Sequence, residues 1–390
     1  MRILYIENNF ICEKDVINAF DDLGCEIHLF PSPPQISEEQ EFYLQQLLVE
    51  MRNVQAEFIF STGFIPFLSL ACGVLQMPYV TWLVDDYHPE HKNAAIRNDW
   101  NFVFVADSVL YGELKEAGIN HVYFLPLAAP EIEKKNVKEN DAMAAKYKAD
   151  ISFIGSVLEH EKREKGPLSD GSNLKDATKG YLAGCVACQL QTKKLPLICS
   201  KFPEYVWDDL KREFPIKNQN SLESAYQYYA NTYFNDAITY DSRIFYLQNI
   251  ANTGKYKRIN HYSRFDVKVS KKVHHCGYAD YYEELPLIAA NSKINMVMAH
   301  YNLRAGISTT AWMIMGAGGF LLTNAQADFS ILEPIKPAVF SDVHEMRHLA
   351  EHYYNHREER VEIIQALSEE INKKHTYRHR IEELLSVLVS

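Results

Sequence analysis

The chain has 390 residues, of which 47% are hydrophobic and 23% are charged. This composition supplies enough apolar side chains for sizeable cores and excludes a wholly disordered chain, and the length suits two domains better than one. Forty lysines and arginines against 51 aspartates and glutamates give a formal net charge of −11. That balance argues against a protein whose main task is to bind nucleic acid.

Apolar residues 3–6 at the start of the chain predict a first strand, and the early Glu7 is incompatible with a secretory signal. The longest uncharged run, residues 305–327, contains four glycines and several hydroxyl side chains. We therefore interpret it as a buried loop, helix and strand, which leaves only peripheral contact with a membrane open. The seven cysteines are scattered and odd in number, which favours a reducing, cytoplasmic location.

The first third of the chain alternates short apolar runs with helical stretches such as 13–23 and 39–52. Strands are expected at residues 3–6, 25–30, 58–61, 79–84, 102–106 and 122–125. Nearly continuous apolar runs are typical of strands buried on both faces. The alternation therefore predicts an open parallel sheet of the doubly wound type.

The remainder of the chain predicts a second unit of the same kind. Strands are expected at residues 150–154, 258–262, 294–298, 320–323 and 338–340, with long amphipathic helices after them. The expected division is a first domain over 1–130, a linker over 131–149, a second domain over 150–365 with a helical insert at about 160–250, and a C-terminal helix over 366–390. The fold class is thus α/β, with two Rossmann-like halves facing each other across a cleft where ligands would bind.

Residues 302–324 predict a loop, a helix, a glycine turn and a strand. Gly306 lets the backbone approach a ligand closely, and Ser308 or Thr309 would cap the helix that follows. Free N–H groups at the helix start, with Arg304 just upstream, would form a binding site for a diphosphate. The competing interpretation is that Gly306 only turns the chain and that Arg304 pairs with an acidic side chain.

Several stretches occur together in a fixed order. In the second half these are GYADYYEELP at 277–286, NSKIN at 291–295, the segment 302–324 and HTYRHR at 375–380. Together they resemble the C-terminal domain of CgeB-like (spore maturation protein type) glycosyltransferases of the group 1 kind. PYVTWLVDD at 78–86, LPLA at 125–128 and ISFIGS at 151–156 are similar to the same family, so that mainly the helical insert is unmatched.

The resemblance implies the GT-B fold, with a nucleotide-sugar donor on the C-terminal domain and an acceptor on the N-terminal domain. It implies a metal-independent glycosyltransferase of the hexosyltransferase type, with no permanently bound cofactor. The donor would be a UDP- or GDP-sugar, and the acceptor a glycan, a lipid-linked sugar or a protein. Helix N-termini and basic side chains would neutralise the leaving diphosphate.

Catalytic candidates follow the predicted strand 79–84, at its end toward the expected cleft. A carboxylate of Asp85 or Asp86, or the imidazole of His88, would act there as general base or hold an acceptor hydroxyl. The alternative is a helix cap and a solvated turn. The residues expected to bind the donor are Gly155, Ser156, Arg243, Tyr278, Tyr281, Asn302, Arg304, Gly306, Ser308, Thr309 and Thr310.

Several of these residues also have purely structural interpretations that need no donor. They are a plain turn at 155–156, an exposed salt bridge for Arg243, and core packing for Tyr278 and Tyr281.

The chain departs from the family pattern in the helix after Ser308. Relatives usually place Arg and then an acidic residue where this chain has Thr310 and Met313. A methionine cannot accept hydrogen bonds from ribose hydroxyls at useful strength. This departure leaves open a non-catalytic nucleotide- or sugar-binding homologue that acts as a partner subunit. A sugar-nucleotide epimerase of the same two-domain architecture is a second alternative.

Overall fold

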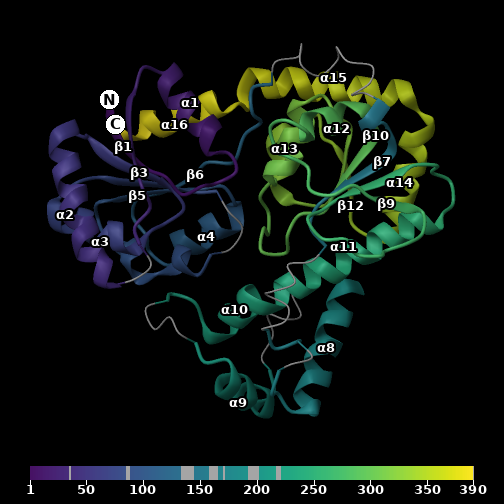
Figure 1. Cartoon of the computed structure of the whole chain (residues 1–390), viewed down its shortest axis with the longest axis horizontal. Coiled ribbons are helices and arrows are strands. Elements are labelled where there is room, and N and C mark those ends of the chain that lie inside the picture. Colours follow the sequence, from purple (N-terminus) through teal and green to yellow (C-terminus); the bar gives the residue numbers. More distant parts are fainter. Residues whose placement is uncertain are drawn as a thin grey trace.

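The structure is a computed structural model of the chain. It describes residues 1–34, 37–84, 88–132, 145–157, 166–169, 172–191, 202–216 and 221–389. Two six-stranded parallel sheets lie side by side, each covered by helices, and a group of helices projects below them (Figure 1). The predicted α/β class with two doubly wound halves is therefore confirmed.

The first sheet has the strand order β2-β1-β3-β4-β5-β6, with all neighbours parallel. Its strands are β1 (Arg2–Ile6), β2 (Glu26–Phe30), β3 (Phe58–Thr62), β4 (Tyr79–Leu83), β5 (Asn101–Val105) and β6 (Val122–Phe124). Every residue of the central strands β3 and β4 is buried, as their continuous apolar sequence predicts for strands with helices on both faces.

The helices of the first half are α1 (Glu13–Asp22), α2 (Ser37–Val54), α3 (Pro66–Leu75) and α4 (Ser108–Glu116), with the short 3-10 helices η1 (Pro89–Lys92) and η2 (Ala94–Arg97) between β4 and β5. They cover the sheet through two buried clusters. Leu47 and Leu68 belong to one cluster, and Val16 and Phe20 belong to the other.

The second sheet has the order β12-β11-β10-β7-β8-β9, again entirely parallel. Its strands are β7 (Ala149–Ile154), β8 (Ile259–Tyr262), β9 (Val273–His275), β10 (Ser292–Val297), β11 (Leu321–Asn324) and β12 (Ala338–Phe340). The edge strand β9 was not predicted, because a three-residue strand containing two histidines has no apolar run to mark it.

The helices after β9 are α12 (Leu285–Asn291), α13 (Thr309–Gly316), the 3-10 helix η5 (Ala327–Leu332), α14 (Val343–Asn355), α15 (Arg357–Lys374) and α16 (Tyr377–Leu388). The uncharged run 305–327 thus forms a loop, α13, β11 and the start of η5, as predicted. Among the described residues, no helix is both long enough and apolar enough to cross a membrane.

The helical insert contains α8 (Asp176–Gln191), α9 (Glu204–Glu213), α10 (Ala225–Tyr229), the π-helix η4 (Ala230–Phe234) and α11 (Asn235–Asn252). Helices α8, α9, α10 and η4 share a core of their own that includes Leu182, Leu210 and Phe234. The end of α11 differs, because Leu247 and Ile250 pack in the core of the second sheet. The predicted insert at 160–250 therefore includes part of a helix that covers this sheet.

The C-terminal helix α16 returns to the first half. Helix α15 runs along the second half and α16 then lies against α1, close to the N-terminus (Figure 1). Ile381 and Leu384 are buried in the same cluster as Val16 and Phe20. Arg380, only 4% exposed, donates from Nε to the carbonyl of Pro126 at 2.7 Å. The predicted boundary at residue 365 falls inside α15.

Gly319, just before β11, offers a direct test of packing against α12 and β10. A Cβ atom there would lie 2.8 Å from the Ala289 carbonyl oxygen and 2.9 Å from Nδ2 of Asn295, whereas one at Gly184 in α8 meets nothing within 4 Å. We expect Gly319→Ala to lower the free energy of unfolding by about 1–3 kcal/mol and Gly184→Ala to raise it by up to about 1 kcal/mol. Urea unfolding of both variants measures this; equal effects would contradict the packing.

Candidate functional site

The carboxyl ends of the two sheets meet through two loops. One joins β5 to α4, and the other, the 302–308 loop, leads into α13. A Cβ atom at Gly306 would lie 3.1 Å from the Ala106 carbonyl oxygen and 3.4 Å from Cα of Asp107. Glycine is therefore needed because the backbones of the two halves touch at this point.

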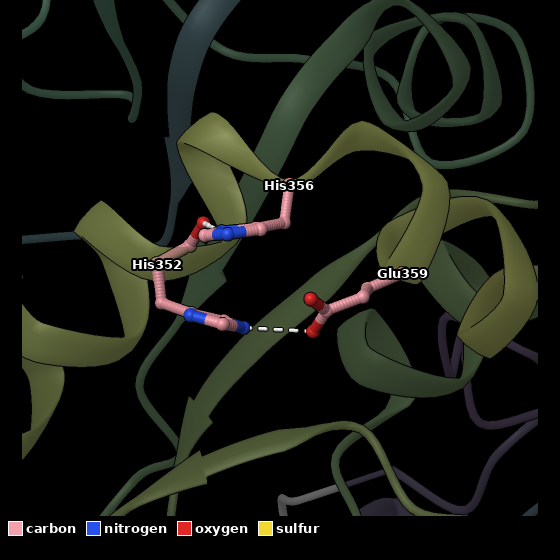
Figure 2. A group of neighbouring side chains, drawn as sticks. All are labelled: His352, His356 and Glu359. Carbon is pink, nitrogen blue, oxygen red and sulfur yellow. Dashed lines mark hydrogen bonds and ion pairs between the residues drawn. The ribbon is translucent and has the colours of Figure 1, made fainter.

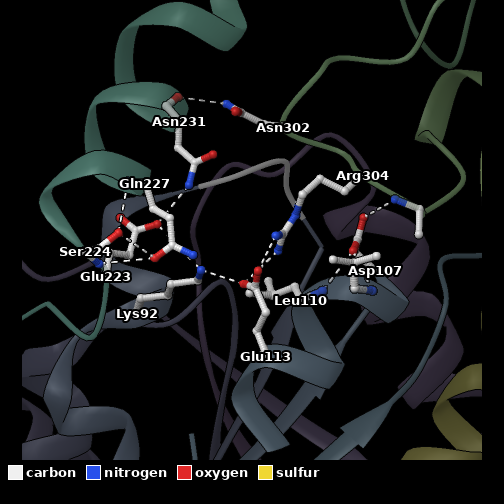
Figure 3. Close-up of polar contacts among 12 residues, drawn as sticks. Lys92, Asp107, Leu110, Glu113, Glu223, Ser224, Gln227, Asn231, Asn302 and Arg304 are labelled. Carbon is white, nitrogen blue, oxygen red and sulfur yellow. Dashed lines mark hydrogen bonds and ion pairs between the residues drawn. The ribbon is translucent and has the colours of Figure 1, made fainter. Parts of the chain in front are cut away.

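Asp107 joins the two loops with a single carboxylate (Figure 3). Its Oδ1 accepts hydrogen bonds from the N–H groups of Val109 and Leu110, both at 3.0 Å, and thereby caps α4. Its Oδ2 accepts from the N–H groups of Ala305 at 2.8 Å and Gly306 at 3.0 Å. The backbone groups expected to bind a diphosphate thus hold a buried carboxylate.

Arg304 makes a bidentate ion pair with Glu113 of α4 (Figure 3). Nη2 donates to Oε2 of Glu113 at 2.9 Å, and Nη1 donates to Oε1. Lys92 Nζ donates to the same Oε2 at 2.6 Å. Burial would raise the pKa of the Glu113 carboxyl, but the hydrogen bonds and charges of Arg304 and Lys92 outweigh it and lower the pKa to about 2. The predicted alternative, an acidic partner for Arg304, is thus present.

The insert reaches this cluster from the other side. The side chain of Lys92 is 8% exposed and lies 3.6 Å from the carboxylate of Glu223, whose own side chain is fully buried. The N–H of Leu222 donates to the Lys92 carbonyl at 2.7 Å. Asn302 Oδ1 accepts from Asn235 Nδ2 at 2.8 Å. Both halves and the insert therefore meet around Lys92, Glu113 and the 302–308 loop.

The second half also contributes a carboxylate to this contact. Asp328 binds the start of α4 in the first half. Oδ2 of Asp328 in η5 accepts the N–H of Ser108 at 3.0 Å, and its other oxygen accepts the Ser108 hydroxyl. Burial raises the pKa of Asp328 above its ordinary value. The N–H of Asp328 donates to the Ala305 carbonyl at 3.1 Å, which fixes η5 to the 302–308 loop.

The start of α13 is formed as predicted. Ser308 is its N-cap and accepts the N–H of Ala311 at 3.3 Å. Thr309 and Thr310 are half-buried, and the Thr309 carbonyl accepts from the Tyr281 hydroxyl at 3.4 Å. Met313 is 1% exposed and packs in the core. The position where relatives are expected to carry an acidic residue is therefore a packing position here.

Gly155, Ser156 and Arg243 come together at the ends of β7 and β10. Arg243 donates from Nη1 to the Ser156 carbonyl at 2.7 Å and from Nη2 to the Met298 carbonyl at 2.9 Å. Gly155 donates its N–H to the Tyr262 carbonyl at 3.2 Å. Arg243 is half-buried. Its guanidinium holds two strand-end loops together.

The two tyrosines predicted for the nucleotide base lie in different surroundings. Tyr278 is 52% exposed, with the Arg264 guanidinium 4.9 Å from the centre of its ring. Tyr281 is 4% exposed, and its hydroxyl lies 3.7 Å from Sγ of Cys12. Core packing therefore describes Tyr281, whereas Tyr278 keeps a ring that a ligand can reach.

Of the acceptor-side candidates, Asp85 and Asp86 lie outside the described residues. His88 is exposed and its Nδ1 accepts the Glu90 N–H at 3.4 Å, so it caps η1. Its neighbour His91 is buried; burial, with the charges of His88 and Lys92, lowers the pKa of His91 to about 3. His91 is thus a neutral imidazole, and sequence reasoning missed it.

Other charged residues of the site were not predicted either, among them Lys92, Asp107 and Glu113. Asp107 had a usable signal, because it is a polar residue directly after a buried strand and before a helix, like Asp85 and Asp86. Lys92 and Glu113 had none, since a lone charge on a helix is most often a solvated side chain.

The arrangement of the two halves is that of solved GT-B glycosyltransferases. A glycosyltransferase from Rickettsia africae matches with a TM-score of 0.56 at 7% identity, over 99% of this chain and 97% of that one. HepE from Anabaena, in complex with UDP and glucose, matches with a TM-score of 0.51 at 10% identity over the whole of both chains. Sucrose-phosphate synthase from Thermosynechococcus elongatus matches at 0.55 and 8%, over 100% and 99%. These likenesses establish the fold.

Residues 243–386 match the model of a family described as glycosyl transferase-like. The matched part runs from α11 to α16 and includes the 302–308 loop. The match does not show the CgeB-like subtype, which stays a prediction. No curated protein matches the sequence.

The hydrogen bonds of Asp107 predict the effect of replacing one carboxylate oxygen by an amide. In Asp107→Asn an NH2 group would face either the α4 cap or the N–H groups of Ala305 and Gly306, and we expect a loss of about 1–3 kcal/mol in the free energy of unfolding. The control is Asp342→Asn at the N-cap of α14, where Asn caps as well as Asp. Urea unfolding compares them; equal losses would contradict the contribution of the loop bonds.

Glu113 predicts a pH dependence. Its pKa in the folded chain, about 2, lies below the ordinary 4.5, so its stabilising contribution is complete above the ordinary value and is lost as the pH falls toward 2. The stability difference between the wild type and Glu113→Gln should therefore shrink from pH 5 to pH 2, as measured by urea unfolding at each pH. A difference that does not change over this range would contradict the ion pair.

Proposed function

We propose that the protein is a metal-independent glycosyltransferase that moves a sugar from a UDP- or GDP-sugar to a hydroxyl of a glycan, a lipid-linked sugar or a protein. The proposal extends to the hexosyltransferase type and to the CgeB-like subtype. The second domain, residues 150–365, would bind the donor, and the first, residues 1–130, would bind the acceptor. The GT-B fold and the glycosyl transferase-like match over 243–386 support this assignment.

One observation carries the proposal. The N–H groups of Ala305 and Gly306 and the guanidinium of Arg304 all hold oxygen atoms of carboxylates. These donors lie next to one another in the 302–308 loop, which leads into α13. A diphosphate offers the same kind of oxygen acceptor, with more charge. The 302–308 loop is therefore chemically suited to stabilise a leaving nucleoside diphosphate.

Donor binding would have to displace the carboxylates. Asp107 and Glu113 belong to the first half, while the loop that they hold belongs to the second. A diphosphate between them would take over Arg304 and the two N–H groups, and the halves would move apart by the space that it fills. Repulsion between the diphosphate and the two carboxylates would act in the same direction.

The acceptor would be held at the end of β4. We propose Asp85, Asp86 or His88 as the group that orients or deprotonates its hydroxyl. His91 adds a neutral imidazole close to this turn, with its ring centre 5.8 Å from that of His88. Because burial lowers its pKa to about 3, this ring would stay neutral near pH 7 and would orient a group by hydrogen bonding rather than take its proton.

A non-catalytic nucleotide-binding homologue is the second candidate. Met313 favours it, because this buried side chain offers no oxygen to the donor ribose. Calorimetry with UDP and GDP, combined with a donor-hydrolysis assay, separates the two: binding without turnover supports the homologue. A sugar-nucleotide epimerase would instead convert the donor with no acceptor added.

Arg304 and Glu113 should have opposite effects on nucleotide binding. Arg304→Ala should weaken UDP or GDP binding by roughly 10- to 150-fold, the equivalent of a charge-assisted hydrogen bond of about 1.5–3 kcal/mol. Glu113→Gln should strengthen it, because a competing carboxylate is removed. Isothermal titration calorimetry measures both, with Arg378→Ala, in an exposed pair with Glu382, as control. Unchanged affinity in Arg304→Ala would place the diphosphate elsewhere.

A further inference from the structure

Two histidines and a glutamate gather at the junction of α14 and α15. His352 lies in the last turn of α14, His356 between the two helices and Glu359 in the first turn of α15. A ligand atom from each of the three lies within 4.8 Å of the others. Figure 2 shows the two rings one above the other, with the carboxylate of Glu359 facing His352. The candidate functional site uses none of these residues.

The contacts within this group already hold the side chains together. Nε2 of His352 lies 2.7 Å from Oε2 of Glu359. The rings of His352 and His356 are stacked, with centres 4.2 Å apart and planes 21° from parallel. All three side chains are at least partly exposed, so an ion and its water can reach them.

A backbone hydrogen bond selects the nitrogen that His356 would offer. Its Nδ1 lies 2.6 Å from the carbonyl oxygen of His352. A carbonyl only accepts, so Nδ1 carries the hydrogen and Nε2 keeps its lone pair. The same arrangement, with the far ring nitrogen bound to a carbonyl or carboxylate, orients histidine ligands in metal sites.

We propose that His352, His356 and Glu359 bind one divalent transition-metal ion, with Zn²⁺ as the best match. Two imidazole nitrogens and one carboxylate oxygen are a ligand set that Zn²⁺ accepts, with water in the fourth position. Tetrahedral coordination with bonds of roughly 2.0–2.1 Å needs ligand atoms about 3.3 Å apart. Side-chain rotations at this exposed junction supply the small closure required.

The position of the site indicates a structural role. The α14–α15 junction lies on the side of the second half that faces away from the first (Figure 1). His356 ends α14 and precedes α15, and its side chain does not cap α15. An ion held from both helices would fix the angle between them, and it would take no part in the reaction proposed above.

A competing arrangement follows from the spacing of the histidines. His344, His348 and His352 recur every four residues, which places them on one face of α14, and His356 follows the end of the helix at the same interval. The rings of His348 and His352 are parallel to within 11° and their centres are 6.4 Å apart. Such a pair could chelate an ion without Glu359, so a test must separate the two arrangements.

The test is Zn²⁺ titration of the full chain, purified without a histidine tag, by calorimetry. We expect one ion per chain, and a loss of affinity of at least about tenfold in both His356→Ala and Glu359→Gln. His348→Ala and Glu358→Gln are the matched controls and should stay within about threefold of the wild type. Co²⁺ in place of Zn²⁺ should show the visible absorption of a four-coordinate ion.

A second readout uses stability. Zn²⁺ should raise the melting temperature of the wild type by mass action, and this rise should be lost in Glu359→Gln. The proposal is overturned if no saturable site of one ion per chain is found. It is also overturned if His348→Ala loses as much affinity as Glu359→Gln, which would assign the ion to the helical histidine pair.

Discussion

Two carboxylates of the first half hold the loop that begins α13 in the second half, and the rest of the site depends on this contact. Asp107 binds the N–H groups of Ala305 and Gly306, and Glu113 binds Arg304. A buried carboxylate without partners would cost several kcal/mol. Any movement that breaks these hydrogen bonds would therefore have to expose the buried Asp107 carboxylate to water or give it other donors.

The same contact explains why the net charge of −11 is compatible with a phosphate-bearing ligand. The cations that matter are placed locally: Arg304 and Lys92 share one carboxylate, and Lys92 also faces Glu223 of the insert. A ligand with more negative charge than a carboxylate competes for these cations at short range, where the average charge of the chain has little influence. These ion pairs form a chain from Glu223 of the insert through Lys92 and Glu113 of the first half to Arg304 of the second half.

Local sequence predicted most of the elements, because strands buried on both faces and an N-capped helix have strong signals. Strand β4 and helix α13 both appear where their apolar runs and Ser308 indicate. Strand β9 and the return of α16 to the first half were not predicted. The first is too short and polar to show periodicity, and the second depends on the fit of Ile381 and Leu384 beside α1, which only the packed chain defines.

Local sequence patterns were sufficient for the α/β class, the second sheet after residue 149 and the N-capped start of α13, since these follow from apolar runs and from Ser308. The contacts of the 302–308 loop depend on how the two halves pack. Glu113 lies 191 residues from Arg304 along the chain, and nothing local marks either as the other's partner. His352, His356 and Glu359 are close in sequence, yet only the angle between α14 and α15 brings their ligand atoms together. Pairing across long separations is set by packing, which periodicity does not encode.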